Sequence, residues 1–253
     1  MLLFAFGIFV DILRSKNIFY SPVEIGPALF TALLLANATI LARSFTRAFT
    51  ANEQLTVELG RTNNELRLTN QAVQRFVPYE FLALLHRESI RDVVRGDSTE
   101  LELEVLFCDL RDFTSIAEHL PTDQTFAFIN DWLAHLEPVI NDHQGFVNQY
   151  LGDCIMAVFT GGADRAVQAG IELVRANQAF GQEQQLVSEE VRVGVGLNTG
   201  PLMLGTIGGR DHLENGVIGD VVNVASRIEA MTKLYDTRFL LTDLTRARLS
   251  EPG

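Results

Sequence analysis

The chain has 253 residues, of which 47% are hydrophobic, and its formal net charge is −12. This length allows one sizeable core together with a smaller additional part. An acidic chain lacks the positive field that holds nucleic acid, so an anionic substrate would need a local cation, an arginine or a helix N-terminus. Its two cysteines, Cys108 and Cys154, lie far apart and argue against a disulfide framework or a zinc site.

The first feature along the chain is an apolar N-terminal region. Residues 25–42 carry no charged side chain and are near the minimum length for a membrane-spanning helix, although a buried core helix is the alternative. The shorter apolar run at residues 1–10 lacks the basic start of a signal peptide, and we interpret it as the end of a membrane helix in a longer chain. Arg43 and Arg47 follow, so the positive-inside rule places the downstream residues in the cytoplasm. Residues 1–45 are thus expected to be a partial transmembrane part in the cell (inner) membrane.

The next segment, residues 46–76, is expected to be a coiled-coil connector. Apolar and small polar residues recur in steps of three and four, which is typical of a heptad repeat. The seam consists of Phe45, Ala48, Asn52, Leu55, Leu59, Thr62, Leu66, Thr69, Val73 and Phe76. Asn52 in this seam favours a parallel dimer of fixed register, whereas a single solvated amphipathic helix is the alternative. Pro78 ends the helix, and residues 77–97 are expected to form a linker with one short helix.

Residues 98–253 are expected to form an α+β domain, a ferredoxin-like (palm-like) antiparallel sheet with helices on one face. In chain order the pattern predicts a strand at 101–109, a helix at 123–142, a hairpin of 146–150 with 154–159, and a helix at 164–180. Residues 191–204 then form a strand pair or one strand broken at Gly200 and Pro201. A short strand and a helix occupy 217–231, and a last strand occupies 238–242.

Two aspartates stand where this sheet could bring them together. Asp109 ends the first strand, and Asp153 lies in the turn of the hairpin. Converging carboxylates without nearby histidine select hard cations such as Mg²⁺ or Mn²⁺, which beside a triphosphate indicate phosphoryl or nucleotidyl transfer. The N–H groups of Leu110–Thr114 would take phosphate oxygens. The alternative is that Asp109 and Asp112 only cap the following helix.

A second pair of polar residues lies on the predicted helix near the C-terminus. Asn223 and Arg227 are four positions apart and therefore share one face. Arg227 could reach charge that develops on a phosphorus atom, and Asn223 could orient a ribose.

Four segments together resemble a known family. LFCDLRDFT, QYLGDCIMAVF, GVGLNTGPLMLGTIG and VIGDVVNVASRIE resemble, in order and spacing, the catalytic domain of class III nucleotide cyclases. The resemblance covers about residues 98–250. The apolar helix, the connector and the FVP segment also resemble membrane-bound bacterial members, in which a receptor part precedes the cyclase.

The resemblance implies a reaction and a role for each matching residue. The ribose 3′-oxygen would attack the α-phosphorus of ATP or GTP, and pyrophosphate would leave. Asp109, Asp153 and the Leu110 carbonyl match metal ligands for two Mg²⁺ or Mn²⁺ ions per site, and Asn223 and Arg227 match the catalytic pair. The matching substrate-binding residues are Leu110, Arg111, Asp112, Phe113, Thr114, Gln149, Leu151, Gly152 and Gly216. In this family the metals and the Asn/Arg pair come from different subunits, so a homodimer would hold two shared sites.

This chain departs from the family pattern at the base-recognition positions. Adenylyl cyclases usually carry Lys at the position of Gln149 and Asp or Thr at that of Gly216, and guanylyl cyclases carry Glu and a small residue. Gln149 can both donate and accept hydrogen bonds; ATP is favoured over GTP because adenylyl relatives are more numerous. The chain also ends before a further hairpin that relatives carry, so we interpret residues 98–253 as C-terminally truncated.

Two alternatives to a nucleotide cyclase remain. One is a catalytically silent, cyclase-like module that dimerises and transmits a signal. The other is a diguanylate cyclase of related palm-like fold, but such enzymes usually carry a Gly-Gly-acidic turn, whereas this chain has Leu151, Gly152 and Asp153.

Overall fold

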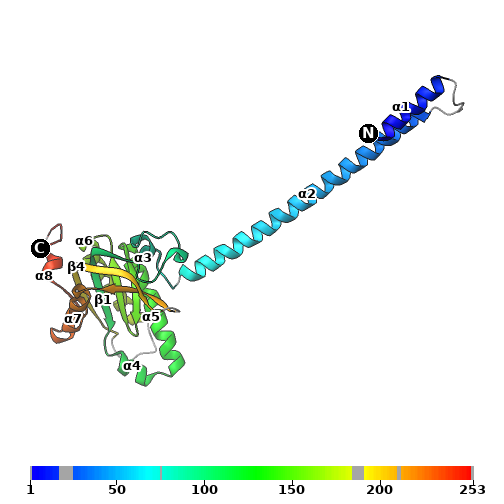
Figure 1. Ribbon diagram of the computed structural model, residues 1–253. Helices are drawn as coiled ribbons and strands as arrows, with labels where there is room; N and C mark the ends of the chain where they lie inside the picture. Colours follow the sequence, from blue (N-terminus) through cyan, green and yellow to red (C-terminus); the bar gives the residue numbers. More distant parts are fainter. Residues whose placement is uncertain (1, 17–24, 75, 184–190, 210–211, 252–253) are drawn as a thin grey trace. The chain divides into compact units, whose positions relative to one another are not determined.

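The computed structural model describes residues 2–16, 25–74, 76–183, 191–209 and 212–251 (Figure 1). The chain divides into two compact units, Met1–Ala72 and Val73–Gly253. The first unit is helical and the second contains the sheet, so each is described separately.

The N-terminal unit consists of α1, Leu2–Ser15, and most of α2, Ile25–Gln74. The 50 residues of α2 give a helix roughly 75 Å long at about 1.5 Å per residue, more than twice the ~30 Å thickness of a hydrocarbon core. Its part Ala28–Val73 is long and apolar enough to cross a membrane, by length and composition. Thr31 and Thr39 donate their hydroxyls to the carbonyls of Ala28 and Leu35, so these polar groups are satisfied within the helix.

The second unit is built on a six-stranded sheet. The strands are β1 Ser98–Leu110, β2 Gly145–Leu151, β3 Cys154–Phe159, β4 Val193–Gly208, β5 Leu213–Ile218 and β6 Phe239–Leu241. Five of them follow the order β2-β3-β1-β4-β5, and every neighbouring pair on this path is antiparallel. The short β6 pairs parallel to β4.

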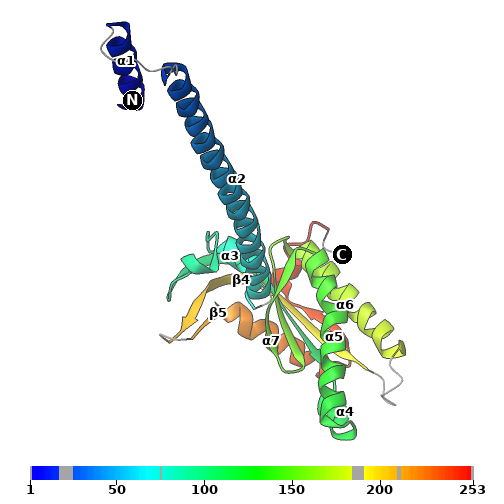
Figure 2. The ribbon, with the colours of Figure 1, turned by 90° about the vertical axis from the view of Figure 1, so that its right-hand side faces the viewer.

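The helices of this unit are α3 Tyr79–Leu84, α4 Phe113–His119, α5 Thr122–Asp142, α6 Ala163–Glu183, α7 Asp220–Leu234 and α8 Asp243–Arg246. A 3₁₀ turn spans Ile90–Asp92. Figure 2 shows α5 and α6 side by side, as their contacts also require.

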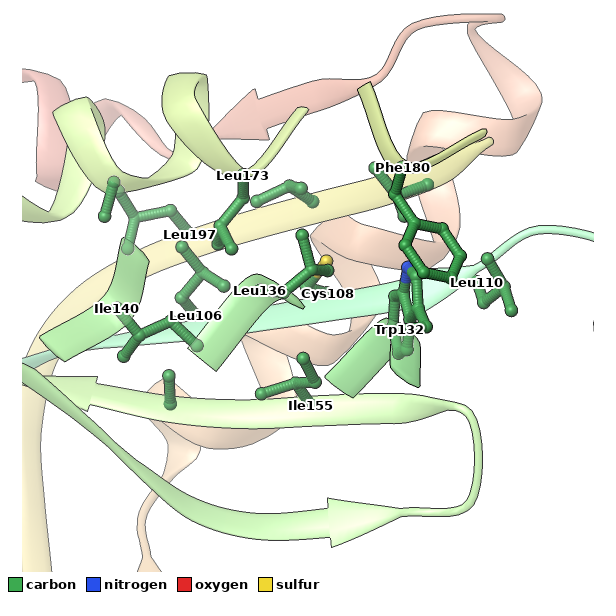
Figure 3. Packing of buried hydrophobic residues seen from close by; sticks show 14 of the residues in the cluster. Leu106, Cys108, Leu110, Trp132, Leu136, Ile140, Ile155, Leu173, Phe180 and Leu197 are labelled. Carbon is green, nitrogen blue, oxygen red and sulfur yellow. The ribbon is translucent and has the colours of Figure 1, made fainter. Parts of the chain in front are cut away.

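One face of the sheet is covered by α5 and α6. Leu106, Cys108 and Leu110, alternate residues of β1, point to this face and pack with Trp132 of α5 (Figure 3). Trp132 is fully buried, and its indole Nε1 donates to Asn177 Oδ1 of α6 at 2.9 Å. This hydrogen bond satisfies the one polar atom that the tryptophan brings into the core.

The opposite face of the sheet is covered by α7 and α3. Val105 and Phe107 of β1 belong to a second cluster with Val221 and Ala225 of α7 and with Phe81 of α3. The antiparallel α+β fold is therefore confirmed, with one correction: the helices do not all lie on one face. The physical reason is the apolar run of β1, which is buried on both sides and so requires cover on both.

The expected break at Gly200 and Pro201 is absent, because β4 continues from Val193 to Gly208. Pro201 lies opposite Glu102 of β1, in the same register as its neighbours. On the other edge of β4, β6 pairs with 195–197 and β5 with 203–208. Pro201 lies in the gap between those two strands, where a strand proline is tolerated.

Candidate active site

The end of β1 and the β2–β3 turn meet. Asp109 pairs with Cys154 in the β1–β3 register, and Cys154 directly follows Asp153 in the chain. The Leu110 N–H donates to the main-chain oxygen of Asp153 at 3.1 Å, which ties the turn to the strand end. Gly152 has φ +69°, a left-handed conformation that glycine adopts readily. The hairpin therefore brings the two aspartates to one end of the sheet, as the sequence led us to expect.

The electrostatics of this pair favour a bound cation. Burial, and after it the charge of the neighbouring Asp153, raise the pKa of Asp109 to about 6. Arg111 and Lys233 lower the Asp109 pKa, but they do not offset burial. Two oxygen donors whose negative charges repel each other fit Mg²⁺ or Mn²⁺. Within the described ranges, no group of three or more His, Cys, Asp and Glu side chains is placed to hold a metal, so this site offers two carboxylates and main-chain oxygens.

The backbone that enters α4 is less open than expected. The N–H groups of Leu110 and Arg111 donate to the oxygens of Asp153 and Arg192, the second at 2.8 Å. These two groups are therefore engaged within the protein and cannot take phosphate oxygens. The expectation that these N–H groups bind phosphate oxygens is therefore wrong for Leu110 and Arg111. For the N–H groups of Asp112, Phe113 and Thr114 it stays a prediction.

Asp112 occupies the N-cap position of α4 but does not cap the helix through its side chain. Its φ is +55°, and its side chain makes no capping hydrogen bond. The carboxylate instead accepts a hydrogen bond from Lys233 Nζ at 3.1 Å and lies 3.6 Å from Arg192 Nη2. Lys233 lowers the pKa of Asp112. The negative charge of Asp112 is thus partly offset by two cations, Lys233 and Arg192.

Arg111 is directed inward, toward α7. Its Nη2 lies 3.2 Å from Glu229 Oε1 and donates to the Glu229 main-chain oxygen at 3.3 Å. The two side chains are only 12% and 11% exposed. A Cβ atom added at Gly194 of β4 would overlap Arg111 and would lie 2.5 Å from Glu229 Oε1. The glycine therefore makes the space in which this ion pair sits.

Glu229 is a residue of the site that the sequence reasoning missed. Burial raises its pKa to about 7, and Asp109 acts in the same direction. The signal was its spacing: Glu229 follows Val221 and Ala225 on the buried face of α7, where an acidic residue is out of place.

Asn223 and Arg227 lie one turn apart on α7, and both are exposed. Val221 and Ala225 hold the buried face of the same helix. Asn223 and Arg227 are thus directed away from the sheet of their own chain, and both side chains are accessible to another molecule.

The expected base-recognition residues lie on the two edge strands. Gln149 is exposed on β2, and Leu151 and Gly152 follow it into the turn. Gly216 lies on β5 opposite Gly205. A Cβ at Gly216 would lie 2.6 Å from Ile207 Cγ1, so the side chain of Ile207 fills the space that a larger residue at 216 would use. Sequence alone had no signal for this contact, because it depends on the β4–β5 register.

Comparison with known proteins agrees with this geometry. The family described as "Adenylate and Guanylate cyclase catalytic domain" matches residues 98–251. An adenylate cyclase of Anabaena cylindrica is 34% identical over 209 residues, which are 80% of this chain and 42% of that protein. The terminal-differentiation-specific adenylate cyclase of Dictyostelium discoideum is 36% identical over 178 residues, 68% of this chain and 8% of that protein. The chain thus spans less than half the length of either relative.

A solved structure carries the same catalytic fold. The crystal structure of a guanylyl cyclase superimposes with a TM-score of 0.53 and 28% identity, over 59% of this chain and 79% of that one. The matched family range begins with β1 and ends after α8, so it contains both aspartates and the Asn223/Arg227 helix. The chain belongs to the family of adenylate and guanylate cyclase catalytic domains.

Proposed function

We propose that this protein converts a nucleoside triphosphate, ATP in preference to GTP, into the 3′,5′-cyclic monophosphate and pyrophosphate in intracellular signalling. The observation that carries the proposal is the meeting of Asp109 and Asp153 at one end of the sheet in a chain that also exposes Asn223 and Arg227 on α7. In the reaction the ribose 3′-oxygen forms a bond to the α-phosphorus. The bond from that phosphorus to the bridging oxygen breaks, and the 3′-proton passes to solvent.

Asp109, Asp153 and the Leu110 carbonyl would hold two Mg²⁺ or Mn²⁺ ions per site. Bound there, the ions supply Lewis acidity that lowers the pKa of the 3′-hydroxyl and offsets the charge of the triphosphate. The N–H groups of Asp112, Phe113 and Thr114 would bind phosphate oxygens at the entrance of α4.

The ribose and the transition state would be contacted by two residues of α7. Asn223 would orient the ribose so that its 3′-oxygen is in line with the phosphorus. Arg227 would stabilise the charge that develops on the phosphoryl oxygens in the transition state. Because both side chains face away from their own sheet, a partner molecule would present its aspartate pair to them.

The active form would therefore be a parallel homodimer with two shared sites. Each site would combine Asp109 and Asp153 of one protomer with the Asn/Arg pair of the other. The seam along α2 would hold the protomers in parallel, and its apolar N-terminal part would anchor the dimer in the cell (inner) membrane, with the catalytic domains in the cytoplasm.

Preference for ATP rests on the adenylate cyclases among the relatives. Gln149 can donate to adenine N1 and accept from the adenine amino group. Ile207 covers Gly216 with an apolar group, which offers no donor or acceptor to the base.

Turnover is the direct test. The 253-residue chain in lipid nanodiscs is incubated with ATP or GTP and Mn²⁺, and cyclic AMP and cyclic GMP are measured. We expect cyclic AMP to dominate, and we expect Asp153→Ala to abolish it. Asp131→Ala, which removes an exposed carboxylate from α5, is the matched control and should keep full activity. A folded dimer that makes neither product would overturn the proposal and favour the silent signalling module.

A further inference from the structure

The two edge strands of the sheet are joined by one side chain. In the order β2-β3-β1-β4-β5, β2 and β5 stand at opposite ends. Yet the Asn215 side-chain Nδ2 of β5 donates to the main-chain oxygen of Asn148 on β2 at 2.7 Å and to its Oδ1 at 3.0 Å. The sheet therefore curls far enough for its edges to meet. We call this pair of hydrogen bonds the Asn148–Asn215 clasp.

The clasp lies on a β-bulge. Val147 pairs with Ala157 and Gln149 pairs with Met156, so Asn148 has no partner residue on β3. Asn148 is only 7% exposed. A buried main-chain oxygen outside the ladder needs another donor, and Asn215 supplies it.

Side-chain packing gives the bulge little further support. Asn148, Gln149, Tyr150 and Asn215 line a cavity of about 960 Å³, which also borders on Pro78. The open space on this side of β2 leaves the bulge free to shift when the clasp is removed. The side chain of Asn148 itself makes a long hydrogen bond, from Nδ2 to Met156 Sδ at 3.9 Å.

The clasp is next to both base-recognition positions. Gln149 directly follows the bulge, and Gly216 directly follows Asn215. A bulge changes the direction in which the next side chain points, so the position of Gln149 depends on how the bulge is held.

We propose that Asn215 is a positioning residue for base recognition, which fixes Gln149 relative to Gly216 by holding the Asn148 bulge. This inference rests on the proposed function, in which Gln149 contacts the base. An asparagine suits the role because its amide nitrogen has two hydrogens, one for each oxygen of Asn148. An aspartate of the same size has no hydrogen to donate when it is ionised, and would repel both oxygens.

The test separates recognition of the base from recognition of the phosphates. Asn215→Asp and Asn215→Ala are prepared in the full 253-residue chain, and Asn141→Asp is the matched control. Asn141 lines the same cavity but takes no part in the clasp, so this control also places a carboxylate there. Equilibrium binding is measured with Mn²⁺ for the non-cyclisable analogues α,β-methylene-ATP and α,β-methylene-GTP and for inorganic pyrophosphate. Turnover of ATP and GTP is measured in parallel.

For both Asn215 variants we expect the Kd of the preferred analogue to rise at least threefold, while the Kd of pyrophosphate stays within twofold of wild type. The ratio of the two analogue affinities should move toward one, and Asn141→Asp should match wild type. Unchanged analogue binding, or an equal loss of analogue and pyrophosphate binding, would overturn the inference. A wild-type chain that binds the analogue but makes no cyclic nucleotide would refute the proposed function. The role of the Asn148–Asn215 clasp would still be decided by the binding measurements.

Discussion

At the scale of single residues, burial and neighbouring charges decide what each acidic side chain of the site can do. Burial and Asp153 raise the pKa of Asp109, so the pair favours a cation. Lys233 lowers the pKa of Asp112, which remains charged but locally balanced. Burial raises the pKa of Glu229 to about 7, and its carboxylate forms an ion pair with Arg111. Residue type alone does not separate these carboxylates, because burial and partners differ at each one.

The space at Gly194 gives a prediction at this scale. In Gly194→Ala the new methyl group would overlap the Arg111–Glu229 ion pair and force it apart. We expect the free energy of unfolding to fall by about 1–3 kcal/mol, the usual cost of overpacking. Trp132 is the single tryptophan and is buried, so its fluorescence in a urea titration reports the change.

The control for this experiment is Gly209→Ala. A Cβ at Gly209 would meet nothing within 4 Å. Its free energy of unfolding should stay within about 0.5 kcal/mol of wild type. Equal stability of the two variants would contradict the packing role of Gly194.

At the scale of elements, α2 joins the apolar segment and the connector in one helix. From the sequence, residues 1–45 and 46–76 are expected to be separate parts, whereas in the structure one helix continues from Ile25 to Gln74. No glycine or proline interrupts the helix between Ala28 and Leu59, so nothing in that part ends it. A rotation or shift of the apolar part would therefore be carried into the connector. The coiled-coil seam itself stays a prediction, because it concerns a second chain.

Cysteine cross-linking tests that seam. In a parallel dimer of matched register, Leu59→Cys would place two thiols face to face, because seam residues contact their counterparts. We expect rapid formation of a covalent dimer under mild oxidation, seen on a non-reducing gel. Glu58→Cys, one position outside the seam, should cross-link at least several-fold more slowly. Equal rates for the two positions would favour the single solvated helix.

At the scale of the whole molecule, the proposed catalytic groups are expected to form two half-sites. The aspartate pair lies where β1 meets the β2–β3 turn, whereas Asn223 and Arg227 are exposed on α7. The Arg111–Glu229 ion pair connects α7 to the residues that follow Asp109. Within one protomer, this ion pair therefore ties the helix that carries Asn223 and Arg227 to the chain segment that follows Asp109.

Complementation tests the sharing of sites. Asp109→Ala and Arg227→Ala should each lack activity alone. When they are co-expressed, half of the dimers are mixed and each mixed dimer has one intact site of two, so activity should return to about a quarter of wild type. Co-expression of Asp109→Ala with Asp153→Ala damages the same half-site in both chains and should restore nothing. Failure of the first pair to recover would show that the sites are not shared.

Membrane attachment is a further prediction for the whole molecule. Leu33→Arg places a charge in the middle of the apolar stretch 25–42, which costs about 2.5–3.5 kcal/mol of insertion free energy. We expect the fraction of protein that remains in membranes after alkaline carbonate extraction to fall. Val57→Arg, which is exposed on the same helix beyond that stretch, is the control and should not change the fraction. Retention of the Leu33→Arg variant at the wild-type level would argue against a spanning helix.

Much of the fold was predictable because its signals are local. Alternation of apolar residues predicted β1, helical spacing predicted α5 and α6, and the Gly152–Asp153 turn predicted the hairpin. The Asp109–Asp153 pair followed from these elements, since an antiparallel strand beside a hairpin can bring a strand end to the turn. The break expected at Gly200 and Pro201 did not occur, because the gap between β5 and β6 is a property of the sheet and not of the segment.

The sequence by itself determined most strands and helices, the placement of Asp109 at a strand end and Asp153 in a turn, and the shared helix face of Asn223 and Arg227, because short-range periodicity and turn chemistry specify them. Only the tertiary structure decided that Arg111 pairs with Glu229, that Ile207 fills the space at Gly216, and that Asn215 closes the sheet on Asn148. Each of these contacts joins residues on different elements. They depend on strand order, on register and on the curl of the sheet, which arise when the whole domain packs.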